Sequence, residues 1–187
     1  MNGIRKRAYF LKSMVLDHEV GAVTMSSKHV IRDVLECLDA PLRTVVEYGP
    51  GEGVMTKALL ERLPPNGRLL VVEPNVRFIE TLRRIKDKRL EVLEGKVQDM
   101  TLEKLREFQG ADAVVSSIPF SLLTPAERFS VVAVTHKLLA PGGSFIVFHQ
   151  YSRLMVRPLK KYFRSVSVVF EPRNILPCFV LNAKKGP

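Results

Sequence analysis

The sequence predicts an α/β protein built on a mostly parallel sheet of seven strands. From Arg43 to about residue 149, short runs rich in Val, Ile and Leu alternate with segments of helical apolar spacing. Strands so nearly continuous in apolar residues are typical of a parallel sheet covered by helices on both faces. A glycine-rich turn joins the first of these strands to the following helix, and two final strands have only a short connection between them. That connection predicts an antiparallel strand at the C-terminus.

The elements are predicted in chain order from apolar spacing, turn residues and capping residues. Two helices are expected before the sheet, one within residues 1–18 and one that is capped by Ser26 or Ser27 and stops at 39–41. The expected strands are 43–48, 68–73, 90–93, 111–116, 144–149, 166–170 and 175–181. The expected helices between them are 53–63, 75–86, 102–108, 125–139 and 153–162, with Pro141-Gly142-Gly143 as the stop of the fourth.

Length and composition restrict the organisation. A chain of 187 residues with 46% hydrophobic content is long enough for one domain with a core, so a single domain over residues 1–187 is expected. Cys37 and Cys178 lack the spacing of a metal site or a redox pair, which indicates a reducing compartment and no bound metal. The formal charge of +10 favours an anionic partner, either nucleic acid, an anionic membrane surface or an acidic substrate.

The first eighteen residues have an apolar stripe, formed by Ile4, Ala8, Leu11 and Val15, next to several cations. Such a helix lies in a membrane interface or packs against its own domain, and the sequence leaves both open. No apolar run is long enough to span a bilayer. We therefore expect a cytoplasmic protein that associates peripherally with membranes, with residues 1–40 covering the site or contacting the membrane.

The glycine-rich turn is the first candidate for chemistry. Glu47 ends the first strand, and Gly49, Gly51 and Gly53 follow at every second position. A ligand approaches a backbone closely only where Cβ is absent, and an acid beside the turn suits a cationic ligand better than a pyrophosphate. Glu73 ends the second strand about 20 residues on, where an acid accepts hydrogen bonds from ribose hydroxyls in nucleoside sites. Both features predict one crevice at the carboxyl ends of adjacent strands.

The Glu-x-Gly-x-Gly-x-Gly turn resembles motif I of the class I S-adenosylmethionine-dependent methyltransferases. From about Phe10 onward the chain is similar to bacterial phospholipid N-methyltransferases, which methylate phosphatidylethanolamine. The resemblance rests on the following segments: Val20-Gly21-Ala22-Val23 with Ser26-Ser27, the turn itself, Ser117-Ile118-Pro119-Phe120, Leu139-Ala140-Pro141-Gly142-Gly143, and Phe148-His149-Gln150-Tyr151. It implies a Rossmann-like fold, S-adenosylmethionine as the cofactor, and methyl transfer to a lipid amine.

The resemblance also implies roles for particular residues. The cofactor is expected to contact Glu47, Tyr48, Gly49, Gly51, Gly53, Glu73, Pro74, Val97, Gln98 and Ser117. The acceptor lipid is expected to contact Ser26, Ser27, Ile118, Pro119, Arg153 and Arg157, the two arginines gripping a phosphate. Phe120 would pack on the methyl group or the amine, and His149 or Tyr151 would take the proton that the amine loses.

Two alternatives stay open at this stage. The Ser117 to Phe120 segment resembles the Asn-x-Pro-Phe motif of ribosomal RNA adenine dimethylases, but Ser117 occupies the asparagine position and lacks the amide's paired contacts to a base edge. The chain also ends soon after the sheet, without the helical domain expected of those enzymes. The second alternative is a methyltransferase-like binding module without activity, which Lys96 suggests because an acid is expected at that position.

Overall fold

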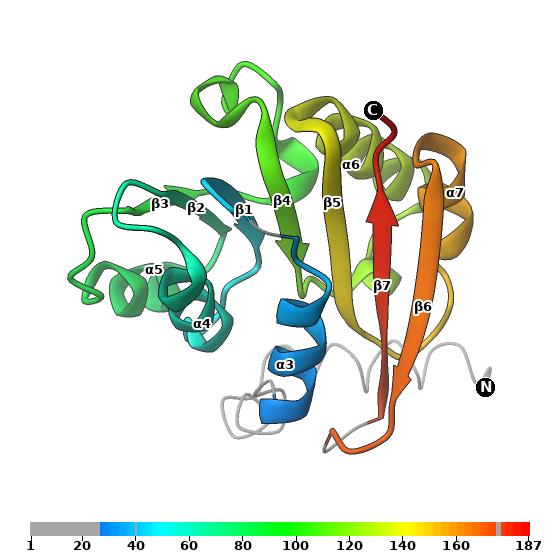
Figure 1. Ribbon diagram of the computed structural model, residues 1–187, viewed down its shortest axis with the longest axis horizontal. Helices are drawn as coiled ribbons and strands as arrows, with labels where there is room; N and C mark the ends of the chain where they lie inside the picture. The colour runs from blue at the N-terminus through cyan, green and yellow to red at the C-terminus, as the bar shows by residue number, and fades with distance from the viewer. Residues whose placement is uncertain (1–26, 40, 175–176) are drawn as a thin grey trace, which may run out of the picture.

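A computed structural model describes residues 27–39, 41–174 and 177–187, and a seven-stranded sheet forms its centre (Figure 1). The strands run in the order β3-β2-β1-β4-β5-β7-β6. They are β1 (Thr44–Tyr48), β2 (Arg68–Glu73), β3 (Leu90–Glu94), β4 (Ala111–Ser116), β5 (Leu139–Gln150), β6 (Ser165–Glu171) and β7 (Cys178–Lys184). The helices are α3 (Lys28–Glu36), α4 (Val54–Arg62), α5 (Val76–Arg83), α6 (Pro125–Leu138) and α7 (Val156–Tyr162). The predicted fold class is thus confirmed.

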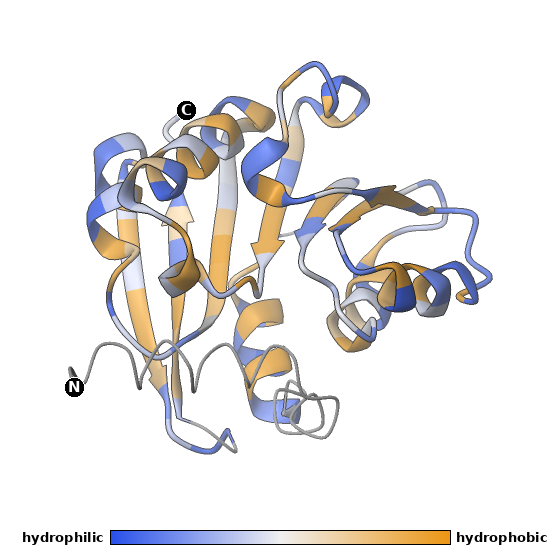
Figure 2. Cartoon of the chain, turned by 180° about the vertical axis from the view of Figure 1, so that it is seen from behind, coloured by the Kyte–Doolittle hydropathy of each residue, from blue (hydrophilic) through white to orange (hydrophobic). Residues whose placement is uncertain are grey.

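Helices cover both faces of the sheet, as the apolar strands predict. Buried side chains of α3, α4 and α5 pack with those on one face of β1, β2 and β4. Alternate residues of the same strands pack with α6, α7 and the short 3-10 turns on the other face. Figure 2 shows the apolar colour running along the central strands, between the two helical layers. Because side chains alternate across a strand, neighbouring residues at a strand end face different layers.

The sheet reverses its strand order between β1 and β4, both of which pair in parallel with their neighbours. In open α/β sheets, ligands bind at the carboxyl ends of the strands where the order reverses. The carboxyl ends of β1, β2 and β4 carry Tyr48, Glu73 and Ser116. The fold therefore brings the glycine turn, Glu73 and the Ser117 to Phe120 segment to one edge of the sheet.

The C-terminal hairpin is present, and its strands lie somewhat differently from the prediction. β7 is antiparallel to both β5 and β6, and it lies between them, so β6 forms the edge of the sheet. β7 begins three residues later than predicted. Its pairing with two strands satisfies the backbone on both sides and buries Val180 and Leu181.

The prediction of a helix at 102–108 is wrong. The structure has turns there and one 3-10 turn, Arg106–Phe108. A seven-residue segment is too short to hold a helix by propensity alone, so tertiary contacts decide its shape. Leu105 and Phe108 are both buried in the layer that contains α6, and Gly110, with φ +82°, turns the chain into β4.

The second N-terminal helix is confirmed as α3. The hydroxyl of Ser27 accepts a hydrogen bond from the Val30 amide at 3.4 Å, which caps the helix. The amphipathic helix expected within residues 1–18, and Ser26, lie outside the described residues. In the part of the chain that the structure describes, no helix is long and apolar enough to cross a bilayer.

Candidate functional site

The glycine turn between β1 and α4 has a backbone that only glycine adopts readily. Gly49, Gly51 and Gly53 have φ angles of +73°, +55° and +80°. The Gly49 amide donates to the Val72 carbonyl at 3.0 Å, and the Gly53 amide donates to the Pro50 carbonyl at 3.0 Å. The turn is therefore tied to β2 at its start and closed on itself at its end, directly before α4.

Space around the turn differs from one glycine to the next. A Cβ atom on Gly49 would lie 2.7 Å from Cγ2 of Ile118, whereas a Cβ atom on Gly51 would meet no atom within 4 Å. Glycine is thus needed at position 49 because a side chain there would collide with Ile118 inside the protein. The backbone at Gly51 borders open space beside a buried carboxylate, an arrangement that fits the expected cofactor.

Glu73 connects the end of β2 to this turn. Its carboxylate accepts hydrogen bonds from the amides of Gly51 at 3.2 Å and Asn75 at 3.0 Å, and only 5% of the residue is exposed. Burial raises the pKa of this carboxyl, and the two amide donors oppose the rise. An acceptor held at the turn by two backbone donors is well placed for ligand hydroxyls, as the sequence predicts.

Glu47 lies in a different environment from the one expected. Its side chain is 1% exposed and accepts a hydrogen bond from the Thr56 hydroxyl of α4 at 2.7 Å, so the carboxyl lies beneath the turn. Burial raises its pKa to about 8; the Thr56 hydroxyl lowers the pKa and the charge of Glu73 raises it further. The raised pKa favours the protonated form of the Glu47 carboxyl at neutral pH. Its contact with the cofactor stays a prediction.

The burial of Glu47 predicts a pH-dependent stability. Between pH about 4.5 and about 8 the folded state holds a proton that the unfolded state has lost, so the free energy of unfolding falls as the pH rises through that window. The slope from this group is at most about 1.4 kcal/mol per pH unit, and it vanishes above the folded pKa. Glu47→Gln is expected to remove the slope. Urea unfolding of both proteins across this pH range measures it, and equal slopes would contradict the assignment.

Tyr48 faces the opposite layer from Glu47. Its ring is 1% exposed and packs edge-on to Phe145, with centroids 6.4 Å apart, and its hydroxyl accepts from Thr135 at 3.4 Å. Burial raises the pKa of this hydroxyl to about 12. The Tyr48 side chain therefore belongs to the core, and the predicted contact of this residue with the cofactor stays a prediction. Only its backbone lies at the turn, where its carbonyl accepts from the Ser117 amide at 3.1 Å.

The segment after β4 is fixed to the turn by several hydrogen bonds. The Ser117 hydroxyl donates to the Gly49 carbonyl at 2.5 Å. The side-chain amide of Gln150 donates to the carbonyls of Ile118 at 3.1 Å and Phe148 at 2.8 Å. Arg128 of α6 donates to the Phe120 carbonyl at 2.9 Å. The segment is thus held in one position by its own Ser117 side chain and by side chains of β5 and α6.

Gln150 and Arg128 are residues of the site that sequence reasoning missed. The sequence places Gln150 at the end of the fifth strand, and a polar amide at that position is a signal that could have suggested a role. Its burial, with 5% of the residue exposed, is known only from the structure. Arg128 carries no such signal, because an arginine in the first turns of a helix is ordinary. Only the fold brings its guanidinium to a backbone carbonyl eight residues earlier.

Phe120 is fully buried among core residues, so in this conformation it presents no surface to an acceptor. Its place beside the methyl group stays a prediction. Pro119 is exposed and Ile118 is half-buried, with Ile118 against Gly49. Ser117 uses its hydroxyl to hold the turn, and Ser27 caps α3.

The remaining predicted residues lie around the same edge or beyond it. Val97 is buried and Gln98 partly buried in a 3-10 turn after β3, and Pro74 is exposed after β2. Tyr151 directly follows β5 and is half-exposed, and Arg153 and Arg157 are exposed. His149 is in β5, but its side chain lies outside the described atoms.

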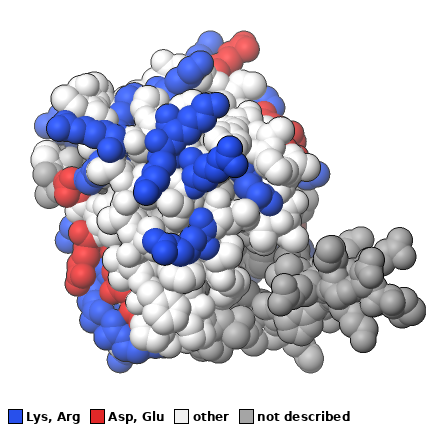
Figure 3. Space-filling view, turned by 90° about the vertical axis from the view of Figure 1, so that its right-hand side faces the viewer, with Lys and Arg blue, Asp and Glu red and all other residues white. Residues whose placement is uncertain are grey.

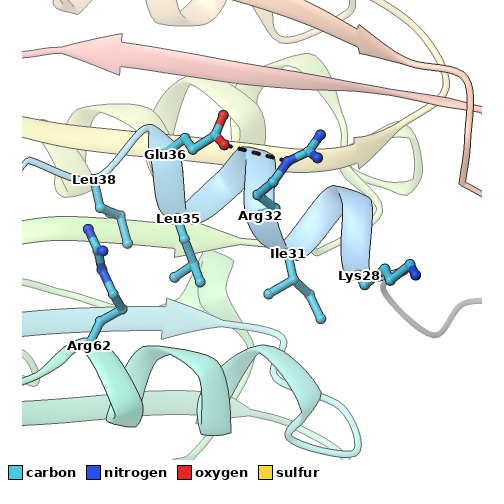
Figure 4. A pocket seen from close by; sticks show the side chains of 7 residues that line it. All are labelled: Lys28, Ile31, Arg32, Leu35, Glu36, Leu38 and Arg62. Atoms are coloured by element: carbon cyan, nitrogen blue, oxygen red, sulfur yellow. Dashed lines mark ion pairs between the residues drawn. The ribbon is translucent and has the colours of Figure 1, made fainter.

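An open hollow elsewhere on the surface is a separate feature. It has a volume of about 480 Å³ and lies between α3 and the last residue of α4 (Figure 4). Its lining residues are Lys28, Ile31, Arg32, Leu35, Glu36, Leu38 and Arg62. An exposed ion pair between Arg32 and Glu36 spans its rim. It contains none of the predicted site residues, and Arg62 ends α4 while the glycine turn begins it, so we do not assign it to the reaction.

Comparison with known proteins agrees with this geometry. The pattern of the family described as "Methyltransferase domain" matches residues 46–145. The ornithine lipid N-methyltransferase of Singulisphaera acidiphila is 34% identical over 138 residues, which are 72% of each chain. The ribosomal RNA small subunit methyltransferase A of Cupriavidus metallidurans is 37% identical over 97 residues, which cover 51% of this chain but 34% of that protein.

The structure of the N-methyltransferase NodS from Bradyrhizobium japonicum WM9 in complex with S-adenosyl-L-homocysteine has the same fold. Its TM-score is 0.73 at 13% identity, with 96% of this chain and 98% of that chain covered. The family match, the relative of comparable length and the turn with its buried acid agree with one another. The chain therefore belongs to the methyltransferase domain family, and it is an S-adenosylmethionine-dependent methyltransferase.

Proposed function

We propose that this protein transfers a methyl group from S-adenosylmethionine to the amine of a lipid head group. The match to the ornithine lipid N-methyltransferase carries the proposal, because it extends over 72% of both chains. The matched part of the ribosomal RNA methyltransferase is 34% of that protein. The acceptor is thus a lipid amine, with ornithine lipid and phosphatidylethanolamine as the two candidates.

The position of Ser117 also supports a lipid over an RNA base. In the adenine dimethylase motif that this segment resembles, an asparagine amide makes paired contacts to the base edge. Here the side chain is a hydroxyl, and it donates its one proton to the Gly49 carbonyl. It has no second donor to offer to a base.

The cofactor would lie along the glycine turn, with its ribose hydroxyls on Glu73 and its adenine beside Val97 and Gln98. It supplies an electrophilic methyl group on a sulfonium. The protein's task is to align a neutral amine with that methyl group, and alignment alone contributes roughly 7 kcal/mol or more to such reactions. The segment held by Ser117, Gln150 and Arg128 would form the wall against which the amine is placed.

The amine must lose a proton before or during transfer. Tyr151 is a poor acceptor for it at neutral pH, because burial, and then the nearby Cys178, raise the pKa of its hydroxyl. A protonated tyrosine donates a hydrogen bond and orients the head group instead. Of the two residues predicted for proton transfer, His149 therefore stays the candidate base, because histidine is the side chain that most often takes this role.

A methyl-transfer assay tests the acceptor. Full-length protein is incubated with methyl-labelled S-adenosylmethionine and, separately, with ornithine lipid, with phosphatidylethanolamine and with folded RNA. Label is expected in at least one lipid and not in RNA. The Glu73→Ala variant is the control for cofactor-dependent transfer.

The outcomes separate the candidate acceptors. Label in RNA without label in either lipid would overturn the lipid proposal. If the labelled lipid is phosphatidylethanolamine, Arg153→Gln and Arg157→Gln are expected to raise KM for it, because a bound phosphate would lose a charged partner. The same variants should change KM for ornithine lipid less.

A further inference from the structure

The positive charge of this protein is concentrated in its last third. Residues 128–187 hold ten Lys and Arg side chains and one acidic side chain, whereas residues 1–127 hold nineteen and eighteen. No acidic residue lies between Glu127 and Glu171. Nearly all of the formal charge of +10 therefore comes from the half of the fold that contains α6, α7 and strands β5 to β7.

Several of these cations gather on one side of the molecule. Arg157, Lys160 and Lys161 on α7 and Arg164 after it are exposed. Among the ion pairs formed by the described residues, none involves these four side chains. Figure 3 shows the face on the right of Figure 1, where the cations cluster over its upper part, in the region of α7 and the start of β6.

The same side carries an exposed apolar end. Val169 and Phe170, near the end of β6, are 46% and 55% exposed. Phe170 pairs with Phe179 of β7, their ring centroids lying 5.2 Å apart. β6 is the edge strand, and its residues 165–170 contain no charge. Natural edge strands usually carry charges or are covered, so this strand is unusual for a surface that faces only water.

The apolar end lies at the same edge of the sheet as the candidate site. In the described part of the chain, every exposed large apolar side chain lies at or shortly after the carboxyl end of a strand that runs in the same direction as β5. These residues are Val76, Leu122, Tyr151, Val169 and Phe170. The glycine turn lies on that same edge. A surface that covers Val169 and Phe170 would thus lie along the same edge of the sheet as the glycine turn, with β4, β5 and β7 between them.

We propose that the face formed by α7 and β6 docks on an anionic lipid membrane, with the α7 cations on the head groups and Val169 and Phe170 inserted at the interface. This docking rests on the proposed lipid acceptor, because it brings the carboxyl edge of the sheet to the membrane and lets a head group enter without leaving the bilayer. Four cations without an ion pair among the described residues, on the same face as two exposed apolar side chains, match the charge and the apolar interior of such a surface.

Charge and polarity argue against two other occupants. A second copy placed against β6 would bring two sets of α7 cations together, and like charges repel. RNA would neutralise the cations, but its phosphates offer nothing to Val169 and the uncharged edge strand. Both occupants are outcomes of the test below.

Vesicle binding by the full-length chain tests the face. The double variant Lys160→Glu, Arg164→Glu is compared with a control double variant, Arg84→Glu, Lys86→Glu. The two control cations are exposed and lie after α5 at the other end of the sheet, and their replacement gives the same change in charge. Each cation near an anionic surface is worth roughly fivefold in partitioning. On phosphatidylglycerol-rich vesicles the α7 pair is expected to weaken co-sedimentation by roughly tenfold or more, and the control pair much less. Vesicles of phosphatidylcholine alone should bind all variants weakly.

Phe170 supplies a second test, should the double variant fail to fold. Phe170→Ser is expected to weaken vesicle binding severalfold, and Phe170→Leu to restore most of it, because leucine keeps an apolar side chain at the interface. Equal weakening by the α7 pair and the control pair would overturn the proposal, as would vesicle binding that is insensitive to Phe170→Ser. The proposal would also be overturned if these variants lost a dimer of the chain, or lost RNA binding alone.

Methyl transfer separates this proposal from the proposed function. The Lys160→Glu, Arg164→Glu protein should methylate lipid dispersed in detergent micelles as well as the unmodified protein does, and lipid in vesicles more slowly. If the lipid acceptor itself is wrong, neither form of the lipid is methylated by any variant. If only the docking face is wrong, both forms are methylated equally by all variants.

Discussion

Replacement of Glu73 by alanine is expected to weaken S-adenosylmethionine binding by roughly 100-fold, because two hydrogen bonds to a charged acceptor are lost. The carboxylate lies at the end of β2, buried and aimed at the glycine turn, where it already accepts from the Gly51 amide. Titration calorimetry with the cofactor measures the effect. Undiminished affinity would refute the ribose assignment.

Glu52 provides the matched control for this variant. It is an exposed acid in the same turn, and among the residues that the structure describes none forms a hydrogen bond or an ion pair with its side chain. Glu52→Ala is expected to leave cofactor affinity within about twofold, since exposed charges contribute little. Glu73→Gln should fall between the two, because an amide oxygen accepts one hydrogen bond while its nitrogen opposes a donor. A melting curve for each variant separates lost binding from lost structure.

Gly49→Ala is expected to have the largest effect on stability and activity together. The new Cβ would be 2.7 Å from Cγ2 of Ile118, and alanine is strained at a φ of +73°. Strain and overpacking together should cost roughly 2 to 4 kcal/mol. For a chain of this size, the melting temperature is then expected to fall by roughly 5 to 15 °C. Because Ile118 is held by Gln150, the displacement should also move the segment after β4 and reduce kcat.

Gly51→Ala separates the role of the turn in packing from its expected role in cofactor binding. Its φ of +55° gives a similar backbone strain, yet its Cβ would meet no protein atom within 4 Å. We expect a loss of only about 1 kcal/mol in stability. The new methyl group would occupy the open space at the turn where the cofactor is expected, so cofactor affinity should fall much more than stability. If both alanine variants lose stability equally, the close contact with Ile118 is not what requires glycine at position 49.

The sequence predicts much of this site because the site lies at the ends of strands that apolar runs mark in the sequence. Apolar runs set the strands, and the carboxyl ends of parallel strands meet at one edge, so Glu47, Glu73 and Ser117 had to lie near one another. The alternation of side chains also required Glu47 and Tyr48 to face opposite layers. Which layer each would face depends on where α4 and α6 pack, and the structure places Glu47 beneath the turn and Tyr48 in the core.

Contacts between distant residues were decided only by the tertiary structure. Gln150 reaches the Ile118 carbonyl across 32 positions of the chain, and Arg128 reaches Phe120 from the next helix. The segment 102–108 follows the apolar contacts of Leu105 and Phe108 rather than its helical spacing. The sequence by itself determined the sheet, the glycine turn and its acids, since these follow from backbone preference and apolar periodicity. The fold alone decided which side chains hold the segment after β4, because those hydrogen bonds join elements whose distance is set by packing.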